Sequence, residues 1–292
     1  MEKVFDNKLL TLNLTDSYLR DYSHIKIGIK ADYLFAPKEV SILSQIIKQA
    51  KTSNVPVLAL GGCSNVLFGN TKDRVLILDK ELPHNINFED KNVKVSGNAN
   101  INYLISLAAN RDLGGLEFLS GIPAHISGLT KMNAGAFGSE ISKFVKWIEI
   151  VNTKGEIKKL HSDQIKWNYR KTDISDYILS VCFRLSSIEK VKINQLCKKY
   201  ISIRKIKQPL NYPNLGSIFK NPPFYSAGEL IDKCDLKGTK KGDAEISSKH
   251  ANIFINRGKA TFSDMQYLIE LARNEVYKNF KIDLELEIQV IN

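Results

Sequence analysis

The segment from Gly115 to Gly138 constrains the fold most strongly, because small residues interrupt every regular period within it. It reads GLEFLSGIPAHISGLTKMNAGAFG, and neither the helical nor the strand period is sustained along it. Glycine, alanine and serine at this density let the backbone approach a ligand closely. The segment therefore predicts backbone packed around something flat or phosphorylated.

A second glycine-containing turn precedes this segment. A predicted strand at Val55–Leu60 runs directly into GGCSN, residues 61–65. We expect Gly61 and Gly62 to permit positive φ and to let backbone amides approach a ligand. Taken alone, the same five residues fit an ordinary β-turn more readily.

Apolar periodicity predicts a mixture of strands and helices in the first two thirds of the chain. The expected strands are 26–36, 55–60, 75–78, 147–151, 156–160 and 178–185. One expected helix begins at Pro37, a second begins at Ile101 and ends near Gly114-Gly115, and a third covers 193–203. The Pro-punctuated loop Gln208–Pro213 is interpreted as the entrance to a second domain. The predicted class is α+β, with a first domain over residues 1–200 and a smaller one over 201–292.

The C-terminal part predicts one amphipathic helix and one strand. Ser263 and Gln266 have the spacing of a capping box, and the helix behind them places a set of apolar residues on one face. That set is Met265, Leu268, Ile269, Ala272 and Val276. The alternation from Leu284 to Val290 then predicts a strand whose leucine, isoleucine and valine side chains face a core.

Charge and cysteine usage bound the location and the partners of the chain. Among 292 residues, 42 are Lys or Arg and 31 are Asp or Glu, a formal net charge of +11. The lysines are dispersed as short pairs, which fits a solvated surface or a site for diphosphate-bearing small molecules as well as it fits nucleic acid. Four separated cysteines without a C-x-x-C pair predict reduced thiols and no metal site. No run of about 20 apolar residues and no signal-type block is present, so we expect a cytoplasmic protein without membrane contact.

Eight short motifs in one order identify a family resemblance. They are GGCSNVLF, GLEFLSGIP, MNAGAFG, YRKT, GSIFKNP, AGELI, SKHANIFIN and a final LEI. From about Ile25 to the C-terminus the chain resembles the UDP-N-acetylenolpyruvoylglucosamine reductase family, flavoenzymes that complete UDP-N-acetylmuramate in bacterial peptidoglycan synthesis. The resemblance implies a two-part FAD-binding domain of the para-cresol methylhydroxylase and vanillyl-alcohol oxidase type, followed by a smaller substrate domain.

The resemblance also implies which residues bind FAD, with NADPH as the co-substrate. Backbone amides of the 61–65 turn would bind the diphosphate, and two later segments would enclose the flavin and its ribityl chain. The residues implied are Gly61, Gly62, Ser64, Asn65, Ser120, Gly121, Ile122, Pro123, Asn133, Ala134, Gly135 and Gly138.

For catalysis the family pattern matches Arg170, Ser217 and Glu287. Arg170 would stabilise the enolate-like charge on the substrate, Glu287 would bond the substrate carboxylate as an acid, and Ser217 would protonate the carbanion-like carbon. The resemblance further suggests Lys207 and Asn221 as contacts to the substrate diphosphate. We expect the three catalytic side chains to meet over one face of the flavin ring.

The chain departs from the family pattern at several positions, most of them glycines in the family. The departures are Ile29, Cys63, Ala124, His125, Ser127 and Thr172. If any of the former glycine positions needs positive φ, the turn must change shape. His125 could contribute a hydrogen bond to phosphate, or it could be a tolerated loop substitution. The short chain also predicts the subtype that lacks an additional substrate-closing segment.

Two other functions remain open from the sequence. One is a different FAD-dependent oxidoreductase on the same fold, since a fold does not fix the chemistry. The other is a basic nucleic-acid-binding protein without catalysis, which would bind in a salt-sensitive way and would be colourless. We expect a monomer that binds a UDP-sugar and NADPH, with no nucleic-acid partner.

Overall fold

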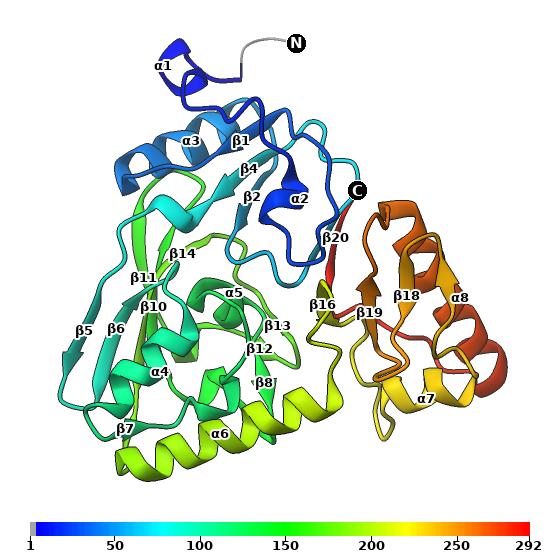
Figure 1. Ribbon diagram of the computed structural model, residues 1–292. Coiled ribbons are helices and arrows are strands. Elements are labelled where there is room, and N and C mark those ends of the chain that lie inside the picture. The colour runs from blue at the N-terminus through cyan, green and yellow to red at the C-terminus, as the bar shows by residue number, and fades with distance from the viewer. Residues whose placement is uncertain (1–3) are drawn as a thin grey trace. The chain divides into compact units, whose positions relative to one another are not determined.

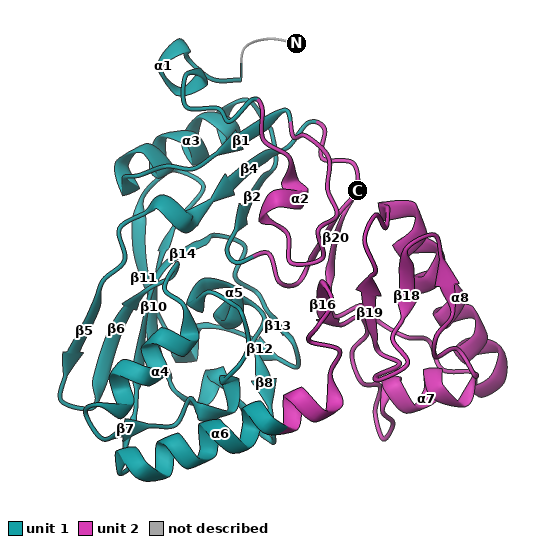
Figure 2. Cartoon of the chain, in the orientation of Figure 1, with its two compact units in different colours: residues 1–15, 32–62, 73–202 teal, residues 16–31, 63–72, 203–292 magenta. Residues whose placement is uncertain are grey.

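Apolar residues spaced at strand and helix periods build three main sheets and their covering helices in the computed structural model, which describes residues 4–292 (Figure 1). The contacts divide the chain into two units (Figure 2). Unit 1 comprises residues 1–15, 32–62 and 73–202, and unit 2 comprises residues 16–31, 63–72 and 203–292. The second unit therefore takes two segments from the N-terminal part of the chain.

Unit 1 begins with a short parallel sheet of order β1-β4-β2. Its elements are α1 (Asn7–Leu10), β1 (Tyr33–Phe35), α3 (Val40–Thr52), β2 (Val57–Leu60) and β4 (Val75–Leu78). Helix α3 buries one apolar face, including Leu43 and Ile46, in the same core as Phe35, Val75 and Ile77. Each fully buried side chain of this size contributes about 1.5–3 kcal/mol.

The larger sheet of unit 1 is antiparallel, with order β11-β10-β14-β6-β5. Its strands are β5 (Ile86–Glu89), β6 (Asn92–Ser96), β10 (Val145–Val151), β11 (Ile157–His161) and β14 (Tyr177–Arg184). The helices α4 (Ile101–Ala109), α5 (Ile126–Lys131) and α6 (Lys190–Lys207) follow the same region of the chain, and α6 carries the division at residue 202. Short pairs complete the unit: β7 (Leu113–Gly114) with β15 (Ser186–Ser187), β8 (Gly135–Ala136) with β9 (Ser139–Glu140), and β12 (Trp167–Asn168) with β13 (Lys171–Thr172).

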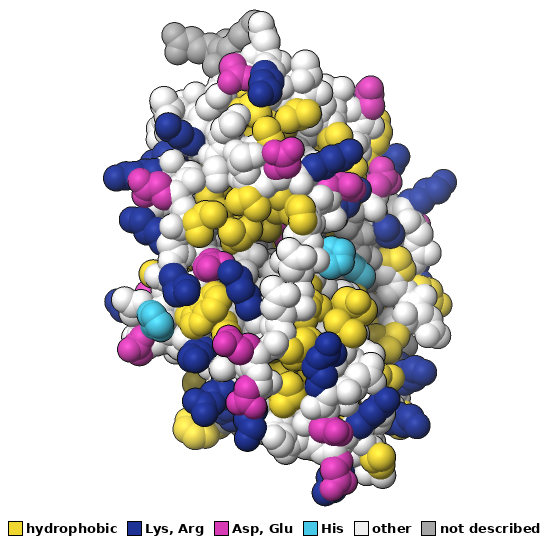
Figure 3. All heavy atoms as spheres, turned by 90° about the vertical axis from the view of Figure 1, so that its left-hand side faces the viewer, with side chains coloured by type: hydrophobic (Ala, Val, Ile, Leu, Met, Phe, Trp, Pro, Cys, Tyr) yellow, Lys and Arg dark blue, Asp and Glu magenta, His cyan; other side chains and the backbone are white. Residues whose placement is uncertain are grey.

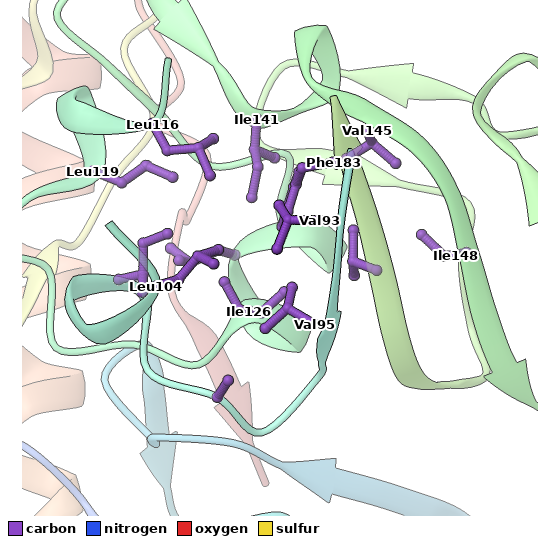
Figure 4. Close-up of a cluster of buried hydrophobic side chains, with 14 of the residues drawn as sticks. Val93, Val95, Leu104, Leu116, Leu119, Ile126, Ile141, Val145, Ile148 and Phe183 are labelled. Atoms are coloured by element: carbon purple, nitrogen blue, oxygen red, sulfur yellow. The ribbon is translucent and has the colours of Figure 1, made fainter. Parts of the chain in front are cut away.

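The core beside the larger sheet is formed by side chains of the sheet and of α4 and α5. Val95 and Phe183 from the sheet point toward Leu104 of α4 and Ile126 of α5 (Figure 4). All four are fully buried. The core therefore fixes the loops that connect these helices, including the glycine-rich segment.

Unit 2 holds an antiparallel sheet of order β16-β19-β18-β17 with two helices. Its elements are α2 (Leu19–Tyr22), β3 (Val66–Phe68), β16 (Asn214–Ser217), α7 (Ala227–Lys233), β17 (Lys240–Lys241), β18 (Ala244–Ile246), β19 (Ile253–Asn256), α8 (Phe262–Phe280) and β20 (Gln289–Ile291). Strand β20 pairs in parallel with β3, and Ile25, Ile27 and Leu67 are buried in the same core as the C-terminal residues.

Four local predictions need correction. The helix expected to run from Ile101 to near Gly114-Gly115 ends at Ala109, and Asp112, with φ +54°, prevents its continuation. The strand expected over residues 26–36 exists only as β1, because Lys26 has φ +60° and Gly28 has φ +152° and both break the extended chain. The capping box of α8 is formed by Thr261 and Asp264, two residues before the predicted pair. The predicted strand from Leu284 to Val290 is a regular strand only from Gln289.

Candidate functional site

The turn after β2 packs closely against residues 123–125. A Cβ placed at Gly61 would lie 3.3 Å from Cβ of His125, and one at Gly62 would lie 3.2 Å from the carbonyl oxygen of Pro123. Neither glycine has positive φ, contrary to our expectation, whereas Cys63 has φ +47°. The two glycines are therefore required by tight approach to the 123–125 segment. Among the six departures from the family pattern, all within the described chain, Cys63 alone takes the left-handed conformation.

The segment from Ser120 to Pro123 is held by Asn102 of α4. Asn102 Oδ1 accepts the N–H of Gly121 at 2.8 Å, and its Nδ2 donates to the carbonyl of Ile122 at 2.9 Å. Gly121 has φ +82°, a conformation that glycine adopts without strain. Ser120 is 2% exposed. Asn102 is not among the predicted site residues, and its role follows from its contacts.

The predicted segment from Asn133 to Gly138 contains the β8–β9 hairpin, which contacts Arg170. Nη2 of Arg170 donates to the carbonyl of Gly135 at 2.6 Å, and Nη1 lies 3.8 Å from Oε1 of Glu140. Asn133 is buried and donates to Oε2 of Glu140 at 3.1 Å and to the carbonyl of Asn168 at 3.0 Å. A Cβ at Gly135 would lie 2.7 Å from Nη1 of Arg170. Within unit 1 the structure thus brings Asn133, Gly135 and Arg170 together, with Glu140 as an unpredicted partner.

Ala134 packs on the larger core, and Gly138 has φ +80° and accepts a hydrogen bond from Lys143 at 3.4 Å. Arg170 itself has φ +55°, in the tight turn between β12 and β13. A non-glycine residue in this region of φ and ψ is uncommon, and such residues cluster at functional sites.

In unit 2 the structure places Ser217, Glu287 and Asn65 in one backbone network. Ser217 is the last residue of β16 and is half-buried. The N–H of Glu287 donates to the carbonyl of Ile218 at 2.8 Å, and Asn65 Nδ2 donates to the carbonyl of Glu287 at 3.1 Å. The N–H of Gln289 donates to the carbonyl of Asn65 at 2.9 Å. Ser217 and Glu287 are therefore carried by adjacent, hydrogen-bonded segments of chain.

The remaining predicted residues lie in unit 2 as well. Ser64 is half-buried beside Asn65 in the chain, and Lys207 is exposed as the last residue of α6. Asn221 Oδ1 accepts the N–H of Ala227 at the start of α7 at 3.0 Å. Burial lowers the pKa of the His250 imidazole below its ordinary value, and the positive charges of Lys237 and Lys207 lower this pKa further.

Asn252 is a supporting residue that sequence reasoning missed. It is 3% exposed, and its side chain accepts the N–H of Phe219 at 2.9 Å and donates to the Phe219 carbonyl at 2.8 Å. These two bonds fix the segment that follows Ser217. The only available signal was an amide residue within the apolar run ANIFIN.

The predicted catalytic residues are divided between the units: Arg170 belongs to unit 1, and Ser217 and Glu287 belong to unit 2. Their convergence over one flavin ring stays a prediction. Across residues 4–292 no group of three His, Cys, Asp or Glu side chains is arranged to hold a metal ion. Within the same range, no helix has the length and apolar character needed to cross a membrane. On the face shown in Figure 3, Lys and Arg side chains are interspersed with acidic and apolar ones.

Two family models match the chain, one in each half. A model described as FAD binding domain matches residues 31–161, and one described as UDP-N-acetylenolpyruvoylglucosamine reductase, C-terminal domain, matches residues 208–291. The predicted fold class, an α+β chain with an FAD-binding domain before a smaller C-terminal domain, is confirmed.

Curated relatives and a solved structure agree with these matches. A protein of Chloroherpeton thalassium named UDP-N-acetylenolpyruvoylglucosamine reductase is 39% identical over 94% of this chain and 91% of its own length. One of the same name from Geobacillus kaustophilus is 34% identical over 95% of this chain and 92% of its own. The crystal structure of the reductase from Thermus caldophilus superposes with a TM-score of 0.81 at 29% identity, covering 94% of this chain and 98% of that one. The chain therefore belongs to the UDP-N-acetylenolpyruvoylglucosamine reductase family.

Proposed function

We propose that this chain reduces UDP-N-acetylglucosamine enolpyruvate to UDP-N-acetylmuramate with NADPH, a step of peptidoglycan synthesis, and that FAD is its cofactor. The observation that carries the proposal is the family match over both halves of the chain, which includes the FAD-binding model and the reductase C-terminal model. The arginine, serine and glutamate that the family pattern implies for catalysis are also present, at Arg170, Ser217 and Glu287.

The residues of the 61–65 turn fit a diphosphate. Backbone at Gly61 and Gly62 lies so close to the 123–125 segment that an added Cβ would crowd it, so a ligand at this turn would meet main chain and not side chains. Ser64 and Asn65 continue this turn, with the Asn65 side chain bonded to the backbone of Glu287. We propose that Ser120–Pro123 and Asn133–Gly138 enclose the flavin and ribityl portions. When bound, FAD would carry the hydride from NADPH to the alkene of the substrate.

Arg170 is proposed to stabilise the negative charge that develops on the substrate. Its side chain is 15% exposed, and its guanidinium is held by the carbonyl of Gly135 and by Glu140, so its direction is set before substrate arrives. Preorganised positive charge lowers the barrier because no reorganisation is needed as the charge forms. Arginine suits a carboxylate because its donors form a planar fork.

Ser217 and Glu287 are proposed to act as the proton donors of the reaction. Ser217 would protonate the carbanion-like carbon, and Glu287, in its acid form, would donate a hydrogen bond to the substrate carboxylate. The Glu287–Ile218 hydrogen bond places the two residues on adjacent segments, and this placement supports their joint action. Lys207 and Asn221 are proposed to contact the substrate diphosphate.

The test separates the two half-reactions of the Ser217→Ala variant. Stopped-flow absorbance should show flavin reduction by NADPH nearly unchanged and flavin reoxidation by the enolpyruvyl substrate slowed by roughly 10²–10⁴-fold, the usual contribution of a positioned acid. Ser263→Ala, on the exposed first turn of α8, is the matched control and should leave both rates unchanged. Equal loss in both half-reactions of Ser217→Ala would contradict the assigned role. A protein that binds no flavin would contradict the proposed function as a whole.

We further propose that the chain works as a monomer in the cytoplasm. NADPH and sugar nucleotides are charged small molecules that are met there, and each unit of the chain buries an apolar core of its own. Light scattering of the holoprotein tests the monomer, and a mass twice that of the chain would contradict it.

A further inference from the structure

A buried carboxylate lies at the end of β4, behind the glycine turn. Asp79 is 1% exposed, and its Oδ1 lies 2.9 Å from Nδ1 of His125. Oδ2 accepts the hydroxyl of Ser127 at 3.4 Å. A buried carboxylate is costly unless it is paired and hydrogen-bonded. His125 and Ser127, two of the departures from the family pattern, are thus both turned toward the same acid.

Tyr177 is a second ionisable neighbour of Asp79. Tyr177 is buried in the same unit, and burial raises the pKa of its phenol, with the negative charge of Asp79 raising this pKa further. Tyr177 therefore stays neutral at ordinary pH. An imidazole beside such a carboxylate is the group that can balance its charge.

The contact with Asp79 also fixes the direction of the His125 ring. Because a carboxylate oxygen accepts hydrogen bonds, the form of His125 that fits this contact carries a proton on Nδ1. The ring lies against the glycine turn: a Cβ at Gly62 would be 3.7 Å from its Cδ2, and one at Gly61 would be 3.6 Å from its Cγ. The second ring nitrogen, Nε2, is the one left to meet a ligand.

A cavity of about 370 Å³ opens beside this ring. It is lined by Lys80, His84, Asn98, Ala99, Asn100, Tyr103 and His125. Three of these side chains are basic, and the acid of the neighbourhood, Asp79, is not among the lining residues. The size falls in the range of small-molecule sites, and the lining suits an anionic nucleotide.

We propose that Asp79 positions His125 as a phosphate ligand, so that the Nε2–H of the imidazolium binds the diphosphate of FAD beside Gly61 and Gly62. The inference rests on the proposed FAD site and adds to it a side chain that the turn alone does not supply. With both ring nitrogens protonated, one N–H donates to Asp79 and the other to phosphate. Loss of a proton turns Nε2 into an acceptor and removes the contact. FAD affinity should therefore fall as pH rises through the range in which imidazoles lose charge, about pH 5–8.

The charged and titratable groups around His125 in unit 1 are Asp79, Lys80, His84, Tyr103 and Tyr177. Of these, His84 is a second imidazole and would give a similar pH profile if it were the group responsible. It is exposed, so its substitution should leave the packing intact. His84→Asn accordingly decides which of the two imidazoles carries the pH dependence, and His161→Asn, at an exposed imidazole outside the cavity lining, is the matched control.

The experiment measures the Kd of deflavinated protein for FAD by flavin fluorescence at pH 6 and pH 8. Wild type should bind about 10-fold more tightly at pH 6, and His125→Ser and His125→Gln should lose this difference, since a hydrogen bond to a charged group is worth about 10- to 100-fold in affinity. His84→Asn should keep the difference between the two pH values whatever its effect on the affinity itself, and His161→Asn should change neither. ADP, titrated in the same way, should show the same loss in the His125 variants.

Several results would overturn the proposal. A merely structural His125 would lower FAD affinity by one factor at both pH values, and unchanged ADP binding would place the contact away from the phosphates. Asp79→Asn should weaken FAD only while His125 is present; an equal effect in the His125→Ser background would remove Asp79 from the pair. If Asp79→Asn does not fold, the His125 variants decide. Wild-type protein that binds neither FAD nor ADP would instead refute the proposed function.

Discussion

Replacing Asn252 tests how the segment after Ser217 is held. In Asn252→Ala, the N–H and the C=O of Phe219 both lose their partners while Phe219 stays fully buried. Each unsatisfied buried group costs about 1–3 kcal/mol, so the free energy of unfolding should fall by about 2–6 kcal/mol. Since a whole domain is stable by only about 5–15 kcal/mol, the loss is large. It corresponds to a fall in Tm of roughly 5–20 °C.

Thermal unfolding and amide hydrogen exchange together measure this loss. The Phe219 amide should exchange much faster in the variant, while the amides of α4 in unit 1 should keep their protection. Asn279→Ala is the matched control, because Asn279 is exposed and bonds mainly to the carbonyl of Glu275 one turn away on α8. It should change stability by no more than about 0.5 kcal/mol. Asn252→Leu separates the effect of the lost hydrogen bonds from the effect of the lost volume, since leucine fills the space without restoring either bond.

Equal stability losses in Asn252→Ala and Asn279→Ala would refute the reasoning, and so would recovery of wild-type stability in Asn252→Leu. The first result would mean that the two bonds have little net value. The second would mean that the lost volume, and not the lost bonds, destabilises the protein.

Two further predictions concern backbone conformation and capping. Gly97→Ala should destabilise the protein by about 3 kcal/mol, measured by urea unfolding, because the new methyl group would overlap a backbone carbonyl of β14. Gly128→Ala in α5 has open space around it and should instead stabilise the protein by about 0.5–1 kcal/mol. A similar loss of stability in both variants would contradict the argument. Thr261→Ala should cost about 1 kcal/mol at pH 7 by removing the cap of α8. Hydrogen bonds from Thr261 hold the pKa of Asp264 below its ordinary value, so this stabilisation is present above the unfolded-state pKa and is lost as pH falls through the folded-state pKa. Urea midpoints should show a smaller gap between wild type and Thr261→Ala at pH 3 than at pH 7, and a gap that widens on acidification would contradict the assignment.

Regular elements with strong periodicity could be predicted from the sequence. The strand expected over 75–78 has those bounds in the structure, the helix expected from Ile101 begins there, and all five core residues predicted for α8 are buried. Their signals are local, because each depends only on the spacing of apolar residues along one element.

Contacts between distant segments could not be predicted in this way. The alternation after Leu284 does bury Leu284 and Ile288, but most of that stretch pairs irregularly with residues 218–220, which no spacing reveals. Asp79 and Asn252 look like ordinary polar residues until their partners, 46 and 33 positions away, are known. Motif order identified the family, while the supporting polar residues required coordinates.

The three-part composition of unit 2 has a consequence for biogenesis. Ile25, Ile27 and Leu67 leave the ribosome long before the residues between 203 and 292 with which they are buried. During translation these apolar side chains stay exposed until the C-terminal segment has been synthesised. Such exposure slows folding and makes the nascent chain prone to aggregation. A fragment that starts at residue 203 would lack them altogether, so the C-terminal portion should not be expected to form its core when expressed alone.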